Sequence, residues 1–250
     1  MSLPLILKRA DGFYSIPTFK SLGFEAFFTT RRFDMAFETV DRSRKFSRKK
    51  AYQKIGLDGS WLVCPSQVHG VSIGVVSRQD RGQGAYVRSA ALKNKDALMT
   101  NEPGLAIAIL TADCLPLFMV DTRKKAICLV HAGWKGLHKK IITQAIQQMR
   151  KVFQTDIPDL VIALGPTLRS CCYEVGKEFI DFFPEATSFR GGKLYLDMAS
   201  AAVSQLLKSG VESGQIYDTH LCTSCLNQEF FSYRRQGKRA GRSMSILKIA

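Results

Sequence analysis

The sequence lacks a hydrophobic run that could cross a membrane, because no apolar segment approaches the roughly 18 residues that a spanning helix needs. The apolar stretch near the N-terminus is too short for a signal peptide. We therefore expect a cytoplasmic protein without a membrane partner. Internal repeats, low-complexity segments and Pro/Gly-rich linkers are also missing, which predicts one domain over residues 1–250.

Acidic residues are few relative to basic ones. The chain has 21 Asp and Glu against 36 Lys and Arg, a net charge of +15 that attracts anions such as phosphates or nucleic acid. The basic residues are densest at 31–32, 42–54 and 234–242, without the interleaved aromatics or known motifs of a nucleic-acid surface. We interpret them as solvated faces or the margin of an anion site and do not expect a nucleic-acid partner. If the protein did bind nucleic acid, its affinity should fall steeply as the salt concentration rises.

The chain has seven cysteines, an odd number, and at 250 residues it is too long to need disulfides for stability. We therefore do not expect a disulfide framework. Reduced thiols, metal ligation or catalysis are the remaining interpretations. Cys222 and Cys225 form a CxxC pair, but no second CxxC is present to complete a four-thiolate site. We interpret this pair as structural thiols and the neighbouring pair Cys171 and Cys172 as packing residues.

What the sequence does have is the composition of a globular protein, with 46% hydrophobic and 23% charged residues. Apolar residues at steps of three and four over 137–153 predict an amphipathic helix. Apolar runs between turn residues predict buried strands. Strands are expected at 23–30, 61–63, 71–77, 97–100, 105–110, 115–120, 126–130, 160–164, 194–196, 230–233 and 243–249, and further helices at 46–57, 176–183 and 198–207. Because these do not alternate strictly, we expect an α/β protein with mixed sheets.

Three polar residues stand out at the ends of predicted strands. His69 and His131 each lie close to a glycine, and Cys114 follows Asp113 at a break between two apolar strands. Two imidazoles and one thiolate are a ligand set that Zn²⁺ uses in catalytic sites, with a fourth position left for water or substrate. Their separations match no short ligand motif, and a buried cysteine with two backbone-bonded histidines would give the same pattern. Asp113, costly to bury without a purpose, is a candidate to orient a ligand or shuttle a proton.

Six segments carry a resemblance to a known family. They read CPSQVHG (64–70), DALMTNEPGLAIAILTADCLPL (96–117), VHAGWKG (130–136), GPTLRSCCYEVG (165–176), CTSC (222–225) and FFSYRRQGKRAGR (230–242). In this order they closely resemble the YfiH-like family, long described as polyphenol oxidases or laccases and now as purine nucleoside phosphorylases with adenosine deaminase activity. The resemblance runs from about residue 24 to the C-terminus.

This resemblance implies an α/β/β/α layered sandwich and one metal site, usually zinc, held by His69, Cys114 and His131. The implied substrates are a purine nucleoside and phosphate, and we expect a monomer. Zn²⁺ can activate a water for deamination at C6, whereas phosphorolysis needs cations that hold phosphate. Arg31 matches a family position and is the first candidate for that role, with Lys135 as a second. Trp134 could stack on the purine or belong to the core.

The sequence departs from the family in two places. Residues 32–35 (RFDM) stand where relatives have a Gly-Gly-Val-Ser loop, and Arg169-Ser170 replaces a Gly-Pro pair. Since Phe and Asp resist the positive φ that glycine permits, we expect the first loop to differ in shape and to affect the choice of substrate.

Two further chemistries remain open at the same residues. Cys114 and His131 could form a thiolate–imidazolium pair, which would make the protein a cysteine hydrolase that edits peptidoglycan precursors, as family members are also described. Copper-dependent polyphenol oxidation is the other alternative, although copper electron transfer usually needs more ligands than one His₂Cys set.

Overall fold

The computed structural model describes residues 3–37 and 43–250, and its strands form two large mixed sheets. Where the chain is described, the first has seven strands in the order β1 (Leu3–Pro4), β17 (Ile216–Asp218), β13 (Leu160–Leu164), β11 (Leu115–Asp121), β12 (Ala126–Ala132), β9 (Ala97–Thr100) and β7 (Ile73–Val75). The second has six, in the order β2 (Lys8–Ala10), β3 (Phe13–Ser15), β4 (Phe24–Thr29), β18 (Ser243–Ile249), β10 (Ala106–Thr111) and β5 (Leu62–Val63).

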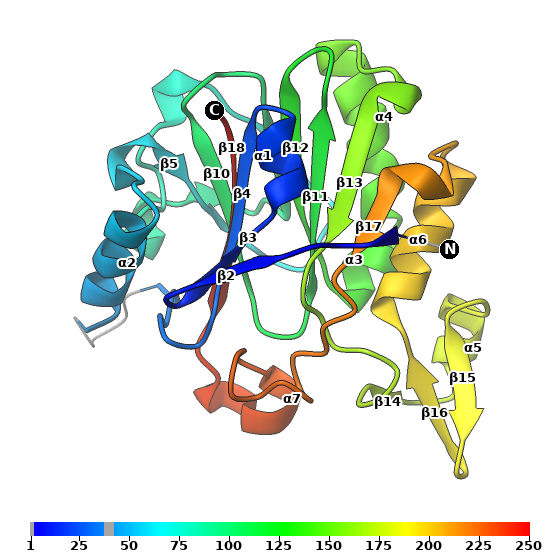
Figure 1. Ribbon diagram of the computed structural model, residues 1–250. Coiled ribbons are helices and arrows are strands. Elements are labelled where there is room, and N and C mark those ends of the chain that lie inside the picture. Colours follow the sequence, from blue (N-terminus) through cyan, green and yellow to red (C-terminus); the bar gives the residue numbers. More distant parts are fainter. Residues whose placement is uncertain (1–2, 38–42) are drawn as a thin grey trace.

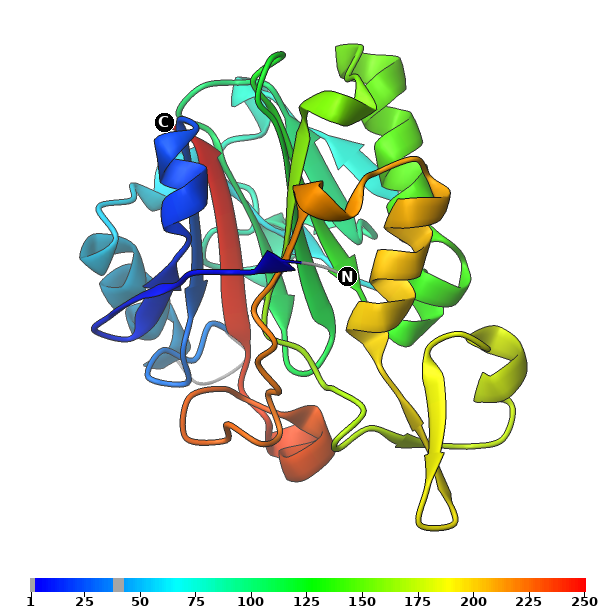
Figure 2. The ribbon, with the colours of Figure 1, turned by 45° about the vertical axis from the view of Figure 1, so that its right-hand side comes forward.

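Helices cover the outer faces of the two sheets (Figures 1 and 2). On the seven-stranded sheet lie α4 (Ile141–Phe153) and α6 (Met198–Lys208), and on the six-stranded sheet lies α2 (Ser43–Lys54). The sheets pack on each other through a third set of buried residues, which includes Phe28, Ile107 and Leu129. The layers are thus α/β/β/α with mixed sheets, which confirms the predicted fold class.

Smaller elements complete the chain. They are α1 (Pro17–Ser21), β6 (Pro65–Ser66), β8 (Leu92–Lys93), α3 (Trp134–His138), β14 (Glu174–Val175), α5 (Phe179–Phe182), β15 (Thr187–Arg190), β16 (Lys193–Leu196) and α7 (Tyr233–Gln236). β14, β16 and β15 form a small antiparallel sheet, and β6 pairs with β8. Within the described ranges no helix has both the length and the apolar character that a membrane span requires.

Strand alternation explains how the core is divided. In β12, Cys128 and Val130 face the helices, whereas Ile127 and Leu129 face the other sheet. By the same alternation His131, the next-to-last residue of β12, belongs to the face between the sheets. The His131 side chain therefore lies between the two sheets, at the end of the sandwich.

Two expected elements are wrong. The single helix predicted over 137–153 is broken into α3 and α4 because Lys140 adopts a left-handed conformation, φ 60°, and the Leu137 carbonyl accepts a hydrogen bond from Gln205 on α6 at 2.6 Å. The strand predicted over 230–233 is absent from these described residues. Tyr233 instead begins α7, whose N-cap Ser232 accepts a hydrogen bond from the Arg235 N–H at 3.4 Å.

The basic run at 42–54 contains a fully buried arginine. Residue 42 lies outside the described residues, but the Arg48 guanidinium donates to the carbonyl oxygens of Met35, Gly84 and Ala85 and lies 4.3 Å from the Phe37 ring centroid. Buried charges need such hydrogen bonds. Arg48 therefore fixes α2 to the loop after β4 and belongs to the structure rather than to an anion-binding face.

Candidate functional site

The three ligand candidates converge at the end of the sandwich, between the two sheets. Cys114 ends the loop from β10 to β11, which connects one sheet to the other, and His131 lies near the end of β12. His69 lies between β6 and β7. The ligand atoms of the three side chains all lie within 4.8 Å of one another, and the two imidazole centroids are 4.8 Å apart.

A carboxylate behind the histidines orders this group. Asp96, which is fully buried just before β9, lies 2.9 Å from His131 Nδ1 and accepts hydrogen bonds from the backbone N–H groups of His69 and Gly70 at 2.9 and 2.7 Å. Burial alone would raise the pKa of Asp96, but the hydrogen bonds from His131 and Gly70 hold it below its usual range. The bond to Nδ1 leaves Nε2 of His131 for a metal, as in many carboxylate–histidine–metal sites.

The electrostatics favour a thiolate at Cys114. Burial by itself would raise the pKa of this thiol, but the imidazoles of His131 and His69 outweigh it and lower the pKa to about 6. Burial would lower the pKa of His131, but the Cys114 sulfur and the Asp96 carboxylate raise it to about 9. Thiolate is the form that ligates a metal and also the form that attacks as a nucleophile.

The residues present fit a metal ion. Two imidazoles and a thiolate are a known zinc donor set, and Gly133 keeps its side of the group open. A Cβ at Gly133 would lie 3.0 Å from Cys114 Sγ and 3.2 Å from His69 Cδ2. Gly133, two residues after His131, thus leaves space beside Cys114 and His69 that a Cβ atom would crowd.

Asp113 is held in a strained backbone conformation, with φ 87°. Its carboxylate accepts hydrogen bonds from the Thr223 hydroxyl and the Arg234 N–H, both at 2.6 Å. Its carbonyl accepts from the Thr167 hydroxyl at 2.8 Å and the Leu168 N–H at 2.9 Å. These four contacts hold the turn that places Cys114, so Asp113 acts on the position of the thiol.

A cavity of about 970 Å³ opens over the three ligand candidates. Its lining carries five basic side chains, one carboxylate and four aromatic rings. They are Arg88, Lys135, Arg234, Lys238 and Arg242, then Asp113, then Phe37, Trp134, Tyr173 and Tyr233. Since the carboxylate of Asp113 already accepts two hydrogen bonds, the charge that the lining offers to a ligand is positive.

Of the three predicted substrate-binding residues, the structure places two in the cavity and one outside its lining. Trp134 and Lys135 line the cavity, where the Trp134 ring also stacks on Phe182 at 6.3 Å and Lys135 Nζ lies 5.5 Å from the Trp134 centroid. Arg31 is not in this lining. It lines a separate hollow, where its guanidinium donates to the Asn227 carbonyl and lies 5.6 Å from the Phe231 ring centroid.

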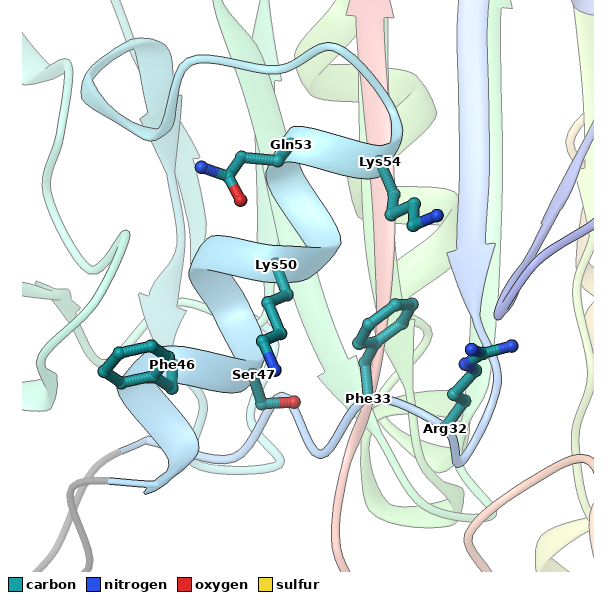
Figure 3. Close-up of a pocket in the computed structure, with 7 residues that line it drawn as sticks. All are labelled: Arg32, Phe33, Phe46, Ser47, Lys50, Gln53 and Lys54. Atoms are coloured by element: carbon teal, nitrogen blue, oxygen red, sulfur yellow. The ribbon is translucent and has the colours of Figure 1, made fainter.

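The loop after Arg31 takes a shape without positive φ at residues 32–35. Phe33 is buried against Gly12, and Asp34 accepts a hydrogen bond from the Arg242 N–H at 3.0 Å. Phe33 also borders another hollow, of about 1050 Å³, with Arg32, Lys50 and Lys54 arranged around it (Figure 3). Among the described residues that line it, that hollow has no histidine, cysteine or carboxylate, whereas the cavity over Cys114 contains all three.

Sequence reasoning missed Asp96 and, among the basic side chains of the cavity, Arg88. A buried aspartate directly before an apolar strand was a usable signal for Asp96. Arg88 gave no signal, because it lies outside the basic runs, whereas Arg234, Lys238 and Arg242 come from the run at 234–242 that was interpreted as a solvated face or the margin of an anion site.

Comparisons with known proteins identify the family of this chain. The chain belongs to the family described as multi-copper polyphenol oxidoreductase laccase, which matches residues 23–250. It is 31% identical to a purine nucleoside phosphorylase of Bacteroides thetaiotaomicron over 97% of each chain. It is 30% identical to adenosine deaminase RL5, from an unknown prokaryotic organism, over 77% of this chain and 76% of that one.

Solved structures give the same fold. YlmD from Geobacillus stearothermophilus superimposes with a TM-score of 0.92 at 29% identity, covering 98% of this chain and 99% of that one. Bacillus licheniformis YfiH superimposes with a TM-score of 0.89 at 28% identity, covering 98% and 99%. The YfiH-like family assignment made from the motifs is confirmed.

Proposed function

We propose that this protein is a zinc-dependent purine nucleoside phosphorylase that also deaminates adenosine, with His69, Cys114 and His131 as the metal ligands. One observation carries the proposal: a three-residue metal ligand set lies in a cavity that is both cationic and aromatic. The cations suit phosphate, and the aromatic rings suit a purine. The names of the relatives, purine nucleoside phosphorylase and adenosine deaminase, point to the same substrates.

When bound, zinc would supply Lewis-acid chemistry at the position that the three residues leave free. The side chains of the protein position the ligands and bind the substrates. Asp96 fixes the ring of His131, Asp113 fixes the turn of Cys114, and Lys135 holds phosphate close to the ligand set. Trp134 and Tyr173 offer ring faces for the base. We place the phosphate on Lys135 and Arg234 rather than on Arg31, because Arg31 lies outside the lining of the cavity.

The multi-copper chemistry in the family description needs several histidine-rich sites. The chain has four histidines. Beyond His69 and His131, His138 packs on Phe182 at 4.4 Å between centroids, and His220 lies 3.4 Å from the Asp218 carboxylate. One His₂Cys set therefore favours a single metal ion in the cavity and hydrolytic or phosphorolytic chemistry there.

The test is incubation of metal-loaded protein with adenosine or inosine, with and without phosphate, and chromatography of the products. We expect phosphate-dependent release of the base with ribose 1-phosphate, inosine from adenosine without phosphate, and neither in Cys114→Ala. Untouched nucleosides with a fully loaded metal site would contradict the proposal. Untouched nucleosides together with hydrolysis of peptidoglycan precursors, blocked by alkylation but not by a chelator, would favour the cysteine hydrolase.

Lys135→Gln tests the phosphate position. Loss of one charge-assisted contact, worth about 1.5–3 kcal/mol, should raise the KM for phosphate by roughly tenfold or more while leaving the KM for nucleoside nearly unchanged. The matched control is Lys139→Gln, an exposed lysine just after α3 and outside the cavity lining. Equal effects of the two substitutions would show that only overall charge matters.

A further inference from the structure

Four cysteines far apart in the sequence meet at one edge of the seven-stranded sheet. Cys171 and Cys172 follow β13, and Cys222 and Cys225 follow β17. These strands pair in parallel, with Leu164 opposite Asp218, and the pairing is extended by an isolated bridge between Thr167 and Cys222. Because parallel strands end at the same edge, both cysteine pairs arrive side by side.

The four sulfur atoms have the spacing of a metal site. All lie within 4.8 Å of one another, and Cys225 Sγ is 3.4 Å from both Cys171 Sγ and Cys172 Sγ. A tetrahedral Zn²⁺ with Zn–S bonds of about 2.3 Å puts its sulfur atoms about 3.8 Å apart, within the same range. A disulfide would require about 2.05 Å. The group thus matches four ligands around one ion.

The local backbone is arranged for thiolates. The N–H groups of Arg169, Ser224 and Cys225 donate to the Cys222 sulfur, so the first cysteine of the CxxC turn is bonded by the N–H groups two and three residues later. Hydrogen bonds from backbone N–H groups stabilise a negatively charged sulfur. They order the turn before any ion binds.

Packing does not account for these residues. Free cysteines are among the most buried residue types, and Cys64 and Cys128 of this chain are fully buried. In the group at the sheet edge, however, Cys171 and Cys225 are exposed. A group of four thiols that reaches the surface is explained if it binds a soft metal ion.

We propose that Cys171, Cys172, Cys222 and Cys225 form a second, structural Zn²⁺ site that is separate from the cavity. Binding of the ion displaces the thiol protons and closes the coordination with four protein ligands, leaving no position for a substrate. Thr223, between two of these cysteines, donates its hydroxyl to Asp113 beside Cys114, and Tyr173 lines the cavity. The second ion therefore braces the loop that positions Cys114.

Metal content per chain tests the proposal. Protein prepared with zinc and a reductant, without a metal-affinity tag, should contain two zinc ions per chain by elemental analysis. The Cys171→Ser/Cys225→Ser variant and the Cys114→Ala variant should each retain one, and their combination none. Cys64→Ala, which removes a buried thiol from neither group, should retain two. The double serine variant should also unfold at a lower temperature than Cys64→Ala.

A second measurement covers the case in which the serine variant does not fold. Cys114→Ala loaded with cobalt should show the intense sulfur-to-metal charge-transfer bands of a tetrathiolate site. A single zinc per chain in the unsubstituted protein that Cys114→Ala abolishes would overturn the proposal. A mass lower by two hydrogen atoms, which reductant restores, would overturn it in favour of a disulfide.

Discussion

Asp96 contacts both segments that carry the histidines of the candidate site. It is fully buried, and three consecutive backbone N–H groups, from Val68 to Gly70, point at its carboxylate while His131 contacts it with Nδ1. One carboxylate thus fixes the backbone that carries His69 and the ring of His131. The sequence shows only an acidic residue before a strand, since its partners come from two other segments.

Asp96→Asn should weaken metal binding at the three ligands by roughly 10- to 100-fold, because an amide accepts fewer of these hydrogen bonds and no longer selects the orientation of His131. Competition with a chromophoric chelator measures this affinity. The matched control is Asp121→Asn, another fully buried aspartate, which accepts bonds from Arg123 and Lys124 away from the site. If both variants bind metal alike, Asp96 acts only on stability.

At the scale of elements, the sequence pattern does not predict the break between α3 and α4. The apolar periodicity continues across residues 137–153, and nothing in it marks Lys140 as left-handed. The break follows from tertiary contact, because α3 must bring Trp134 to the cavity while α4 packs along the sheet. The chain changes direction at Lys140, which adopts a left-handed conformation with φ 60°.

Lys140→Gly should stabilise the protein. A non-glycine residue in the left-handed region costs about 1–2 kcal/mol, of which glycine recovers part after its own entropy cost of roughly 0.5–1 kcal/mol. We expect Tm to rise by about 1–3 °C in thermal unfolding followed by circular dichroism. Lys139→Gly, at a residue with φ −82°, should lower Tm. A fall in Tm for both variants would refute this account of the break.

Over the whole molecule, the C-terminal strand lies in the middle of its sheet (Figure 1). β18 pairs with β10 from Ser243 to Lys248 and with β4 from Ser245 to Ile249. The N-terminal strand β1 is an edge strand that pairs with β17 at two residues. The last residues of the chain should therefore matter far more to folding than the first.

Deletion of residues 243–250 should prevent folding, because it removes a central strand and exposes the core between the sheets. Deletion of residues 1–4, which removes the edge strand β1, should leave a folded protein. Circular dichroism and urea unfolding of the soluble fractions measure both. A cooperatively unfolding 243–250 deletion would show that β4 and β10 can pair without β18.

The sequence by itself determined the mixed α/β class, the strands around the site and the three ligand candidates, because those signals are local, whereas the α/β/β/α layering was implied by the family resemblance. Apolar runs and strand-end histidines can be read within a few residues of one another. The single-domain organisation and the monomeric state stay predictions. The sequence also suggested Arg31 for phosphate, yet the structure turns that side chain towards Asn227 and a different hollow.

Only the tertiary structure decided which distant residues meet. The parallel pairing of β13 with β17 unites Cys171 and Cys172 with Cys222 and Cys225, which appeared in the sequence as two unrelated pairs. Burial decided that Arg48 is structural and that Asp96 supports the ligands. The physical reason is the same in each case: hydrogen bonding between strands and exclusion of water act across the fold, between segments whose separation along the chain carries no record of the contact.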